Sequence, residues 1–215
     1  MQKHAEFTCL SISPIDLSPP GIALATARAG GVGILDHEYC HGGSLVRAVD
    51  NLRWLLGLTP RNQRIGLRLA LTRLDNDTVS ALLEPLSQRD HWLILCRWQP
   101  DGLAQQMSRL PSCAKRRTLL EVSDAAQISG LSAMPASIDG LVAKGSESGG
   151  WVGGESAFVL AQKLLSKSIL PVYVQGGIGV YTAAACRAGG AAGVVAEASS
   201  RLSQQQCVDH LELTE

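Results

Sequence analysis

Charged and aromatic residues are scarce in this sequence, and the charges cancel. Only 18% of the 215 residues are charged and 4% are aromatic, while 19 basic residues balance 19 acidic ones. The longest basic run is Lys115-Arg116-Arg117, so the extended positive surface of a nucleic-acid-binding or membrane-surface protein is missing. We therefore expect no nucleic-acid partner and no membrane partner.

Long apolar runs and paired cysteines are missing as well. No apolar run reaches the roughly 20 residues of a transmembrane helix, and residues 1–6 lack the apolar core of a signal peptide. The six cysteines are scattered, with no Cys-x-x-Cys spacing and no metal-binding motif. This pattern is typical of small buried side chains in a reducing compartment. The sequence predicts a cytoplasmic protein.

Hydrophobic residues make up 46% of the chain and follow an alternating pattern. Strands are predicted at residues 7–13, 32–35, 65–71, 92–96, 118–122, 140–143, 171–174 and 193–196. Helices are predicted at residues 20–28, 44–56, 76–86, 102–110, 124–131, 156–166, 181–188 and 204–211. Eight such units predict one α/β domain over residues 1–215, a compact (β/α)₈ TIM barrel with short loops. The alternative is an open doubly wound sheet, which the absence of Gly-x-Gly-x-x-Gly after the first strand disfavours.

Two glycine-rich loops follow predicted strands, at the end of a barrel where active sites lie. Residues 144–154 contain five glycines, and residues 175–179 lead into a predicted helix. Glycine lets the backbone approach a ligand closely, and the start of a helix attracts anions. A flexible surface loop and tight strand-to-helix packing are the alternatives. Residues 29–36 are predicted to lie at the opposite end of the barrel. The histidines, His37 among them, fall on predicted loops at that end, at a strand start or at the termini.

Four segments together resemble the family of flavin-binding nitronate monooxygenases and FMN-dependent enoyl reductases. Residues 27–35, 145–153, 171–178 and 187–194 are similar, in order and spacing, to the family's AxAGGLGxLG, GxEAGGHxG, PVIAAGGI and ALGADGV. The resemblance implies an FMN barrel that oxidises alkyl nitronates or reduces enoyl thioesters. Short loops and a Trp after the Gly-Gly pair are most similar to barrel domains of polyketide and polyunsaturated fatty acid synthases.

The resemblance also implies the site residues and partners. It assigns cofactor contacts to Gly145, Ser148, Gly149, Gly150, Gly176, Gly177 and Glu197, and catalytic roles to Lys144, Trp151 and Arg68. The substrate would be an acyl thioester or another small molecule. If the chain is a piece of a larger multidomain synthase, other synthase domains would be its partners.

Three positions depart from the family's pattern. Trp151 replaces a histidine and cannot act as a general base. Glu197 and Ala198 stand where a Gly-Thr pair would complete the phosphate site, and the carboxylate would repel a phosphate unless a cation such as Arg201 neutralised it. Arg68 replaces an asparagine, and it could hold a phosphate or form a buried pair with Glu121 or Glu197.

Three hypotheses follow from these residues. The first is an FMN-dependent oxidoreductase of the enoyl reductase type, with Lys144 or Arg68 as proton donor or electrostatic stabiliser and Trp151 shaping the acyl pocket. The second is a degenerate, non-catalytic barrel that serves as a structural or docking module of a synthase. The third, by fold analogy alone, is a phosphate-binding barrel such as an isomerase or a thiamin-type synthase, which would use Glu121 and Lys144.

Overall fold

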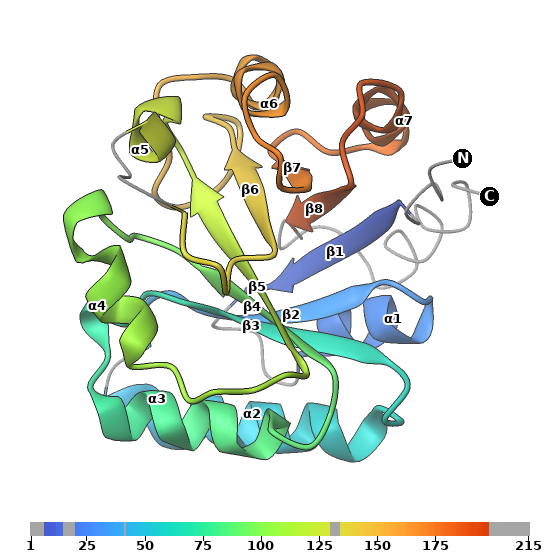
Figure 1. Cartoon of the computed structure of the whole chain (residues 1–215). Helices are drawn as coiled ribbons and strands as arrows, with labels where there is room; N and C mark the ends of the chain where they lie inside the picture. Colours follow the sequence, from blue (N-terminus) through green and yellow to red (C-terminus); the bar gives the residue numbers. More distant parts are fainter. Residues whose placement is uncertain (1–6, 15–19, 41, 130–133, 198–215) are drawn as a thin grey trace.

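Eight parallel strands close into a barrel, in which each strand pairs with its neighbour in sequence and β1 pairs with β8 (Figure 1). The structure is a computed structural model that describes residues 7–14, 20–40, 42–129 and 134–197. The strands are β1 (Thr8–Ser13), β2 (Val32–His37), β3 (Arg64–Leu69), β4 (His91–Leu95), β5 (Arg116–Val122), β6 (Gly140–Lys144), β7 (Val172–Gln175) and β8 (Gly193–Glu197). The predicted (β/α)₈ barrel is therefore confirmed, and the open sheet is excluded.

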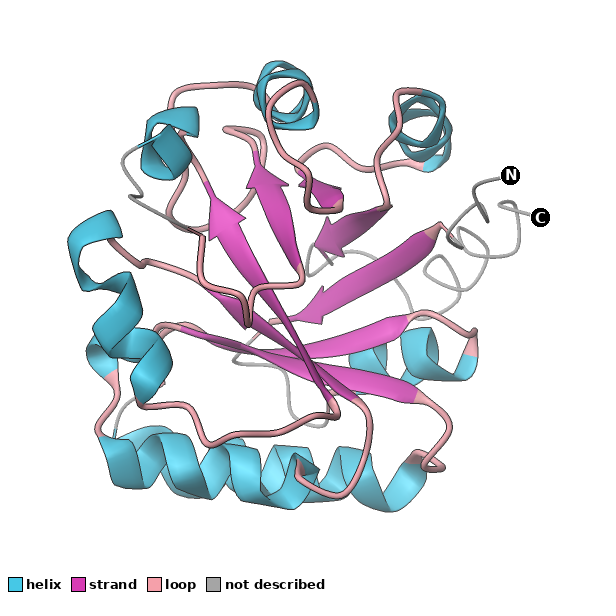
Figure 2. Cartoon of the chain, viewed as in Figure 1, coloured by secondary structure: helices cyan, strands magenta, loops and turns pink. Residues whose placement is uncertain are grey.

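Helices cover the outside of the barrel (Figure 2). They are α1 (Gly21–Arg28), α2 (Leu45–Leu58), α3 (Asn76–Leu83), α4 (Leu103–Ser108), α5 (Ala125–Ser129), α6 (Ala157–Leu165) and α7 (Val180–Ala188). The predicted closing helix at residues 204–211 lies outside the described residues. None of the helices in the described ranges has the length and apolar character needed to cross a lipid bilayer. The five cysteines in those ranges are free thiols.

Most of the strands are apolar on both faces, as is typical of parallel strands covered by helices. The exception is β1, whose helix-facing Ser11 and Ser13 form hydrogen bonds with Thr26 and with the Ala23 N–H of α1. One face of each strand packs against the helices, and the other fills the barrel. We call the buried side chains that fill it the plug; they are Leu10, Ile12, Val32, Ile34, Trp92, Ile94, Leu119, Val142, Tyr173 and Val195. The barrel interior is thus a solid core rather than a channel.

A polar layer lies above the plug, toward the carboxyl ends of the strands. Because side chains alternate along a strand, each of its members stands two residues after a plug residue, except Arg68, which stands two residues after Gly66. The members are Asp36, Arg68, Glu121, Lys144, Gln175 and Glu197. The strand register places Asp36 beside Arg68 and Lys144 beside Gln175. The layer therefore forms one continuous floor for the mouth of the barrel.

Many element boundaries differ from the prediction by one or two residues. Three of the differences concern β2, β3 and α3. Strand β2 continues two residues beyond Leu35. Strand β3 ends at Leu69, because residues 71–73 form a 3₁₀ turn. The helix predicted at 76–86 is α-helical only to Leu83 and continues as a 3₁₀ turn at 84–86, since Pro85 has no N–H to donate to an α-helical bond.

Gly66 and Gly57 offer a matched test of this packing. A Cβ at Gly66 would lie 2.7 Å from Ile34 Cδ1 and in collision with the Trp92 carbonyl, whereas Gly57, on α2, has open space around it. We expect Gly66→Ala to lower the free energy of unfolding by about 1–3 kcal/mol. Gly57→Ala should raise it by roughly 0.5–1 kcal/mol. Thermal unfolding measures both; equal shifts would contradict this account of the barrel interior.

Candidate functional site

Arg68 is the centre of the polar layer. Its guanidinium is 2% exposed and forms a two-pronged pair with Glu121, from Nε to Oε2 at 2.7 Å and from Nη2 to Oε1 at 2.9 Å. Its Nη1 donates to Glu38 at 2.7 Å and to both oxygens of Asp36 at 3.1 and 3.2 Å. One buried cation therefore holds three carboxylates from β2, the turn after β2, and β5.

Two further cations join this network. Lys144, which is 1% exposed, lies 3.6 Å from Glu121, and Arg97 lies 3.4 Å from Glu38. With Glu197, these residues comprise four carboxylates and three cations, a formal charge of −1 for the set. We call this set the mouth network: Asp36, Glu38, Arg68, Arg97, Glu121, Lys144 and Glu197. Each cation of this set pairs with a carboxylate of the same set, either Glu38 or Glu121.

The proton affinities at the mouth follow from burial and pairing. Burial alone would lower the pKa of Arg68, but the charge of Glu121 and the hydrogen bonds to it raise that pKa above its usual value. Burial raises the pKa of Asp36, and the attraction of Arg68 opposes this rise. Burial also raises the pKa of Cys96 well above its usual value, so its thiol stays protonated and is a poor nucleophile.

The glycine loops predicted from sequence do meet at the mouth. Glu197, at the end of β8, accepts a hydrogen bond from Gly149 N–H at 2.6 Å and another from the Gln175 side chain. The Ser148 hydroxyl lies next to Gly176, at 2.9 Å from where its Cβ would be. The loops after β6 and β7 are therefore in contact, and a carboxylate already occupies one of their N–H groups.

The other predicted glycines have backbone roles at the same place. Gly150, Gly176 and Gly177 have φ values of +76°, +120° and +61°, which favour glycine over any other residue. Gly145 N–H donates to the Gln175 carbonyl at 2.9 Å. Its own Cβ would collide with α6 at Ala157. These glycines are needed for the turns whether or not a ligand is bound.

A hollow at the mouth opens beside Arg68. Its volume is about 220 Å³, below the roughly 300–1,000 Å³ of typical small-molecule sites. It is lined by Ile12, Pro14, Asp36, Glu38, Tyr39, Arg68, Gly149, Gly150 and Glu197. Three of these residues are acidic, so the described walls favour a cationic or neutral group over an anion.

Trp151 lies outside this hollow. Its side chain is 60% exposed, and the Arg97 guanidinium lies 5.0 Å from the centre of its ring. Arg97 has the positive φ of 55° that a non-glycine residue rarely adopts. It also lies 6.0 Å from the Tyr39 ring. Arg97 thus links the two aromatic rings at the rim to the mouth network through Glu38.

Two assignments made from sequence are wrong. Asp36 belongs to the mouth and not to the opposite end, because β2 extends to His37 and carries Asp36 into the polar layer. His37 also lies at the carboxyl end of β2, although it falls on the helix-facing side of the strand. Of the alternatives left open for Arg68, the structure contains the buried pair with Glu121, whereas Glu197 accepts hydrogen bonds from Gly149 and Gln175.

Sequence reasoning missed Glu38, Tyr39 and Arg97. Glu38 follows the alternation of Ile34 and Asp36 along β2, so an extension of that strand by two residues would have indicated it. Arg97 is the second residue after β4, where active-site loops begin, but its backbone conformation leaves no signature in the sequence. The catalytic and cofactor roles assigned to the site residues stay predictions.

Comparison with known proteins supports the fold. No family model and no curated protein matches the chain. Among solved structures it is similar to FabK from Thermotoga maritima, with a TM-score of 0.68 and 23% identity over 89% of this chain. It covers 58% of that chain, so it spans only about three fifths of FabK.

Two other structures match over nearly their whole length. Thiamine phosphate pyrophosphorylase from Pyrococcus furiosus has a TM-score of 0.60 and 14% identity, with 98% of this chain and 94% of that chain covered. A structure described as native KDPGal has a TM-score of 0.61 and 15% identity, with 99% and 95% covered. At these identities the likenesses show the barrel fold alone.

Arg68→Met tests the mouth network. Removal of the cation leaves three carboxylates without their partner, which we expect to lower the free energy of unfolding by about 3–5 kcal/mol at pH 7. Because acid neutralises those carboxylates, the loss should shrink between pH 7 and about 4. Arg53→Met, which removes one member of an exposed pair with Asp50, should change stability by less than about 1 kcal/mol. Denaturant unfolding of both variants across this pH range measures the two losses. If the loss of unfolding free energy in Arg68→Met is the same at every pH, the mouth network does not account for it.

His37 predicts a second pH effect. Burial lowers its pKa from 6.5 to about 4, and neither ring nitrogen has a hydrogen-bond partner among the described residues. Between pH 6.5 and about 4, His37 is therefore protonated in the unfolded chain but neutral in the folded chain. Protonation of the unfolded chain lowers the free energy of unfolding, which keeps its full value above pH 6.5 and falls by roughly 3 kcal/mol as the pH drops toward 4. His37→Leu should flatten the stability profile in that window; an unchanged slope would exclude His37 as its source.

Proposed function

We propose that this chain is a barrel of the flavin-dependent enoyl reductase type that has become non-catalytic, and that it serves as a structural or docking module of a synthase. The observation that carries the proposal is the position of Glu197. This residue stands where the resemblance places the end of the phosphate site, and its carboxylate takes the Gly149 N–H group that a cofactor would use. The Glu197 carboxylate therefore occupies the hydrogen-bond donor that the phosphate of a bound cofactor would need.

FMN fits the described mouth poorly. Its phosphate is a dianion, and the Glu197 carboxylate stands at the loops that would receive it. Glu147 also stands there and accepts from Ala157 N–H at 2.8 Å, but it matches the glutamate of the family's GxEAGGHxG pattern and does not count against FMN. Two unit charges 4 Å apart repel by about 4 kcal/mol near a protein surface. The described cations cannot offset this, because Arg68, Arg97 and Lys144 already pair with Glu38 and Glu121.

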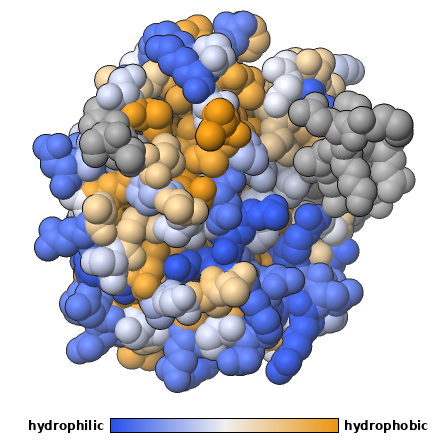
Figure 3. All heavy atoms as spheres, viewed as in Figure 1, coloured by the Kyte–Doolittle hydropathy of each residue, from blue (hydrophilic) through white to orange (hydrophobic). Residues whose placement is uncertain are grey.

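Exposed apolar side chains suit a docking role. Trp151 and Phe158 are 60% and 66% exposed, and they lie on the loop after β6 and on α6. Hydrophobic residues gather in the upper part of the space-filling view, where Figure 1 places α5 and α6, while the lower edge over α2 and α3 is largely hydrophilic (Figure 3). Clustered apolar surface favours contact with protein. The proposal that the contact is another synthase domain rests on the sequence resemblance.

The second candidate is an active FMN-dependent enoyl reductase that acts on acyl thioesters. Two observations favour it. FabK, an FMN-dependent enoyl reductase, is a structural neighbour. In addition, the Ser148 hydroxyl and the Gln175 side-chain oxygen are buried without a hydrogen-bond partner among the described residues. Under this candidate Lys144 or Arg68 would supply a proton or stabilise charge, and Trp151 would contact the acyl chain.

A flavin-retention experiment decides between the two candidates. The absorbance spectrum of the purified chain is recorded as isolated, and again after incubation with excess FMN and removal of the free flavin. We expect no retained flavin bands. Bands near stoichiometric level would overturn the proposal in favour of the reductase, which an assay with enoyl thioesters would then test.

Glu197→Gln tests whether repulsion by the Glu197 carboxylate is what keeps FMN from binding. This change removes the charge and keeps the size of the side chain, so we expect FMN affinity to rise at least tenfold, which corresponds to about 1.4 kcal/mol. Glu155→Gln is the matched control, since Glu155 pairs with Lys163 on α6 and its loss should change FMN affinity by less than about threefold, or roughly 0.7 kcal/mol. Equal effects of the two changes, measured by quenching of flavin fluorescence, would rule out Glu197 as the barrier.

A further inference from the structure

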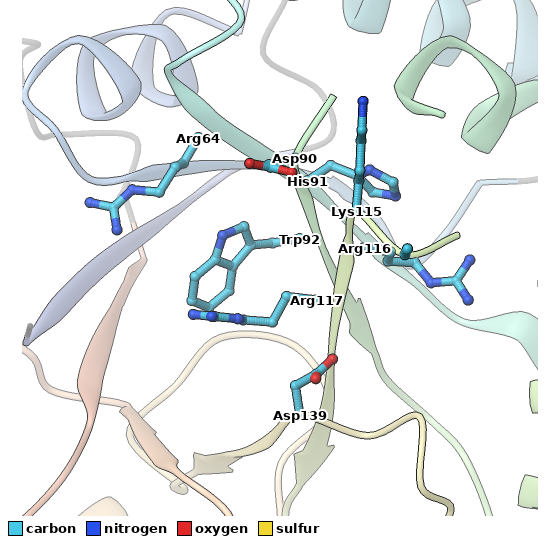
Figure 4. A pocket seen from close by; sticks show the side chains of 9 residues that line it. Arg64, Asp90, His91, Trp92, Lys115, Arg116, Arg117 and Asp139 are labelled. Atoms are coloured by element: carbon cyan, nitrogen blue, oxygen red, sulfur yellow. The ribbon is translucent and has the colours of Figure 1, made fainter. Parts of the chain in front are cut away.

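The amino-terminal end of the barrel contains a second hollow, on the far side of the plug from the mouth. Its volume is about 420 Å³, within the range of roughly 300–1,000 Å³ of small-molecule sites. It is built at the starts of β3, β4 and β5 and at the turn before β6 (Figure 4). Its charged side chains are Arg64, Lys115, Arg116, Arg117, Asp90 and Asp139. We call it the amino-end pocket.

The charge of this pocket is opposite to that of the mouth. Four cations against two carboxylates give a formal charge of +2, whereas the mouth network has −1. Burial lowers the pKa of His91, and the nearby Arg116 adds to this effect, so the imidazole is neutral at pH 7 and does not enter the balance. One of the two carboxylates is also partly engaged, because Asp139 accepts the Thr118 N–H at 2.7 Å. An anion is therefore attracted to this end of a chain whose overall charge is zero.

Arg117 is held in place for binding. Its guanidinium lies 4.8 Å from the centre of the Trp92 ring, and Figure 4 shows the two groups side by side in the middle of the pocket. Burial raises the pKa of the neighbouring Tyr173 hydroxyl, and the Arg117 charge opposes this rise; the Tyr173 ring meets the Trp92 ring edge-on at 5.7 Å. A guanidinium has five N–H donors. The donors of Arg117 form a preorganised fork of the kind that binds phosphate or carboxylate oxygens.

The other cations stand at the rim, where Figure 4 shows their side chains extending away from Arg117. Lys115 donates to the Gln88 carbonyl at 3.2 Å, and Arg116 donates to the Pro111 carbonyl at 2.7 Å. Hydrogen bonds to neutral carbonyls fix these side chains but do not cancel their charge. They contribute a positive field around the central fork.

We propose that the amino-end pocket binds a small anionic ligand through a phosphate, diphosphate or paired-carboxylate group, with Arg117 as the central contact. A formal charge of +2 matches an anion of two negative charges, and the fork geometry matches its paired oxygens. This inference does not depend on the function proposed for the mouth, because the plug separates the two sites.

Calorimetric titration of the full chain tests the proposal, with pyrophosphate and citrate as separate probes in a phosphate-free buffer of low ionic strength. We expect saturable 1:1 binding of at least one probe with a Kd below about 1 mM. Tighter binding of pyrophosphate would identify a phosphate ligand, and tighter binding of citrate a carboxylate ligand. Absence of saturable binding by both probes would overturn the proposal.

Variants separate a built site from general attraction. Arg117→Gln should weaken binding at least tenfold, and Arg117→Lys by a smaller factor, because lysine keeps the charge but loses the fork. Lys115→Gln should weaken it about threefold through the field alone, or roughly 0.7 kcal/mol. Arg61→Gln removes an exposed cation from the loop before β3, outside the pocket lining, and should change the Kd less than twofold, or about 0.4 kcal/mol. Equal losses in Arg117→Gln and Arg61→Gln, with both variants folded by thermal unfolding, would show a diffuse attraction and refute the site.

Discussion

The mouth of this barrel depends on one buried guanidinium. Arg68 lies above the apolar plug, where an ion without partners would be very costly, and it exists there because three carboxylates surround it. Each of those carboxylates then fixes something else. Glu121 positions Lys144, and Glu38 positions Arg97, which in turn lies over Trp151. The arrangement of this half of the mouth therefore follows from the position of a single side chain on β3.

This arrangement explains why a resemblance to a flavin-binding family does not by itself establish flavin chemistry. The parts of the sequence that resemble the family are mainly glycines, and in the structure these glycines make turns and let helices approach strands. Such demands come from the fold and persist when a ligand is lost. Chemistry depends instead on the six positions of the polar layer, and at Arg68 and Glu197 this chain departs from the family's pattern.

The fold could be predicted from sequence because it is set by many weak and consistent signals. Eight apolar runs of strand length, separated by helical segments, are compatible with few other architectures. The site was harder, because its geometry depends on where each strand ends. An underestimate of β2 by two residues moved Asp36 and His37 from the mouth to the opposite end. The pair between Arg68 and Glu121 was accessible, since both are charged residues in otherwise apolar strands and need partners. The clustering of Glu38, Arg97 and Tyr39 depends on loop conformations, among them the rare φ of Arg97, and no local pattern encodes these.

The plug has a consequence for how such a protein can change over generations. Ten close-packed apolar side chains separate the polar layer from the amino-end pocket, and the residues that line the hollow at the mouth are all different from those that line the amino-end pocket. Substitutions that are distant and share no contacts usually have additive effects. Selection can therefore alter the chemistry at one end of the barrel while the other end and the folded state are retained, so that a lineage can abandon an old activity and acquire a new binding function in separate, individually tolerable steps.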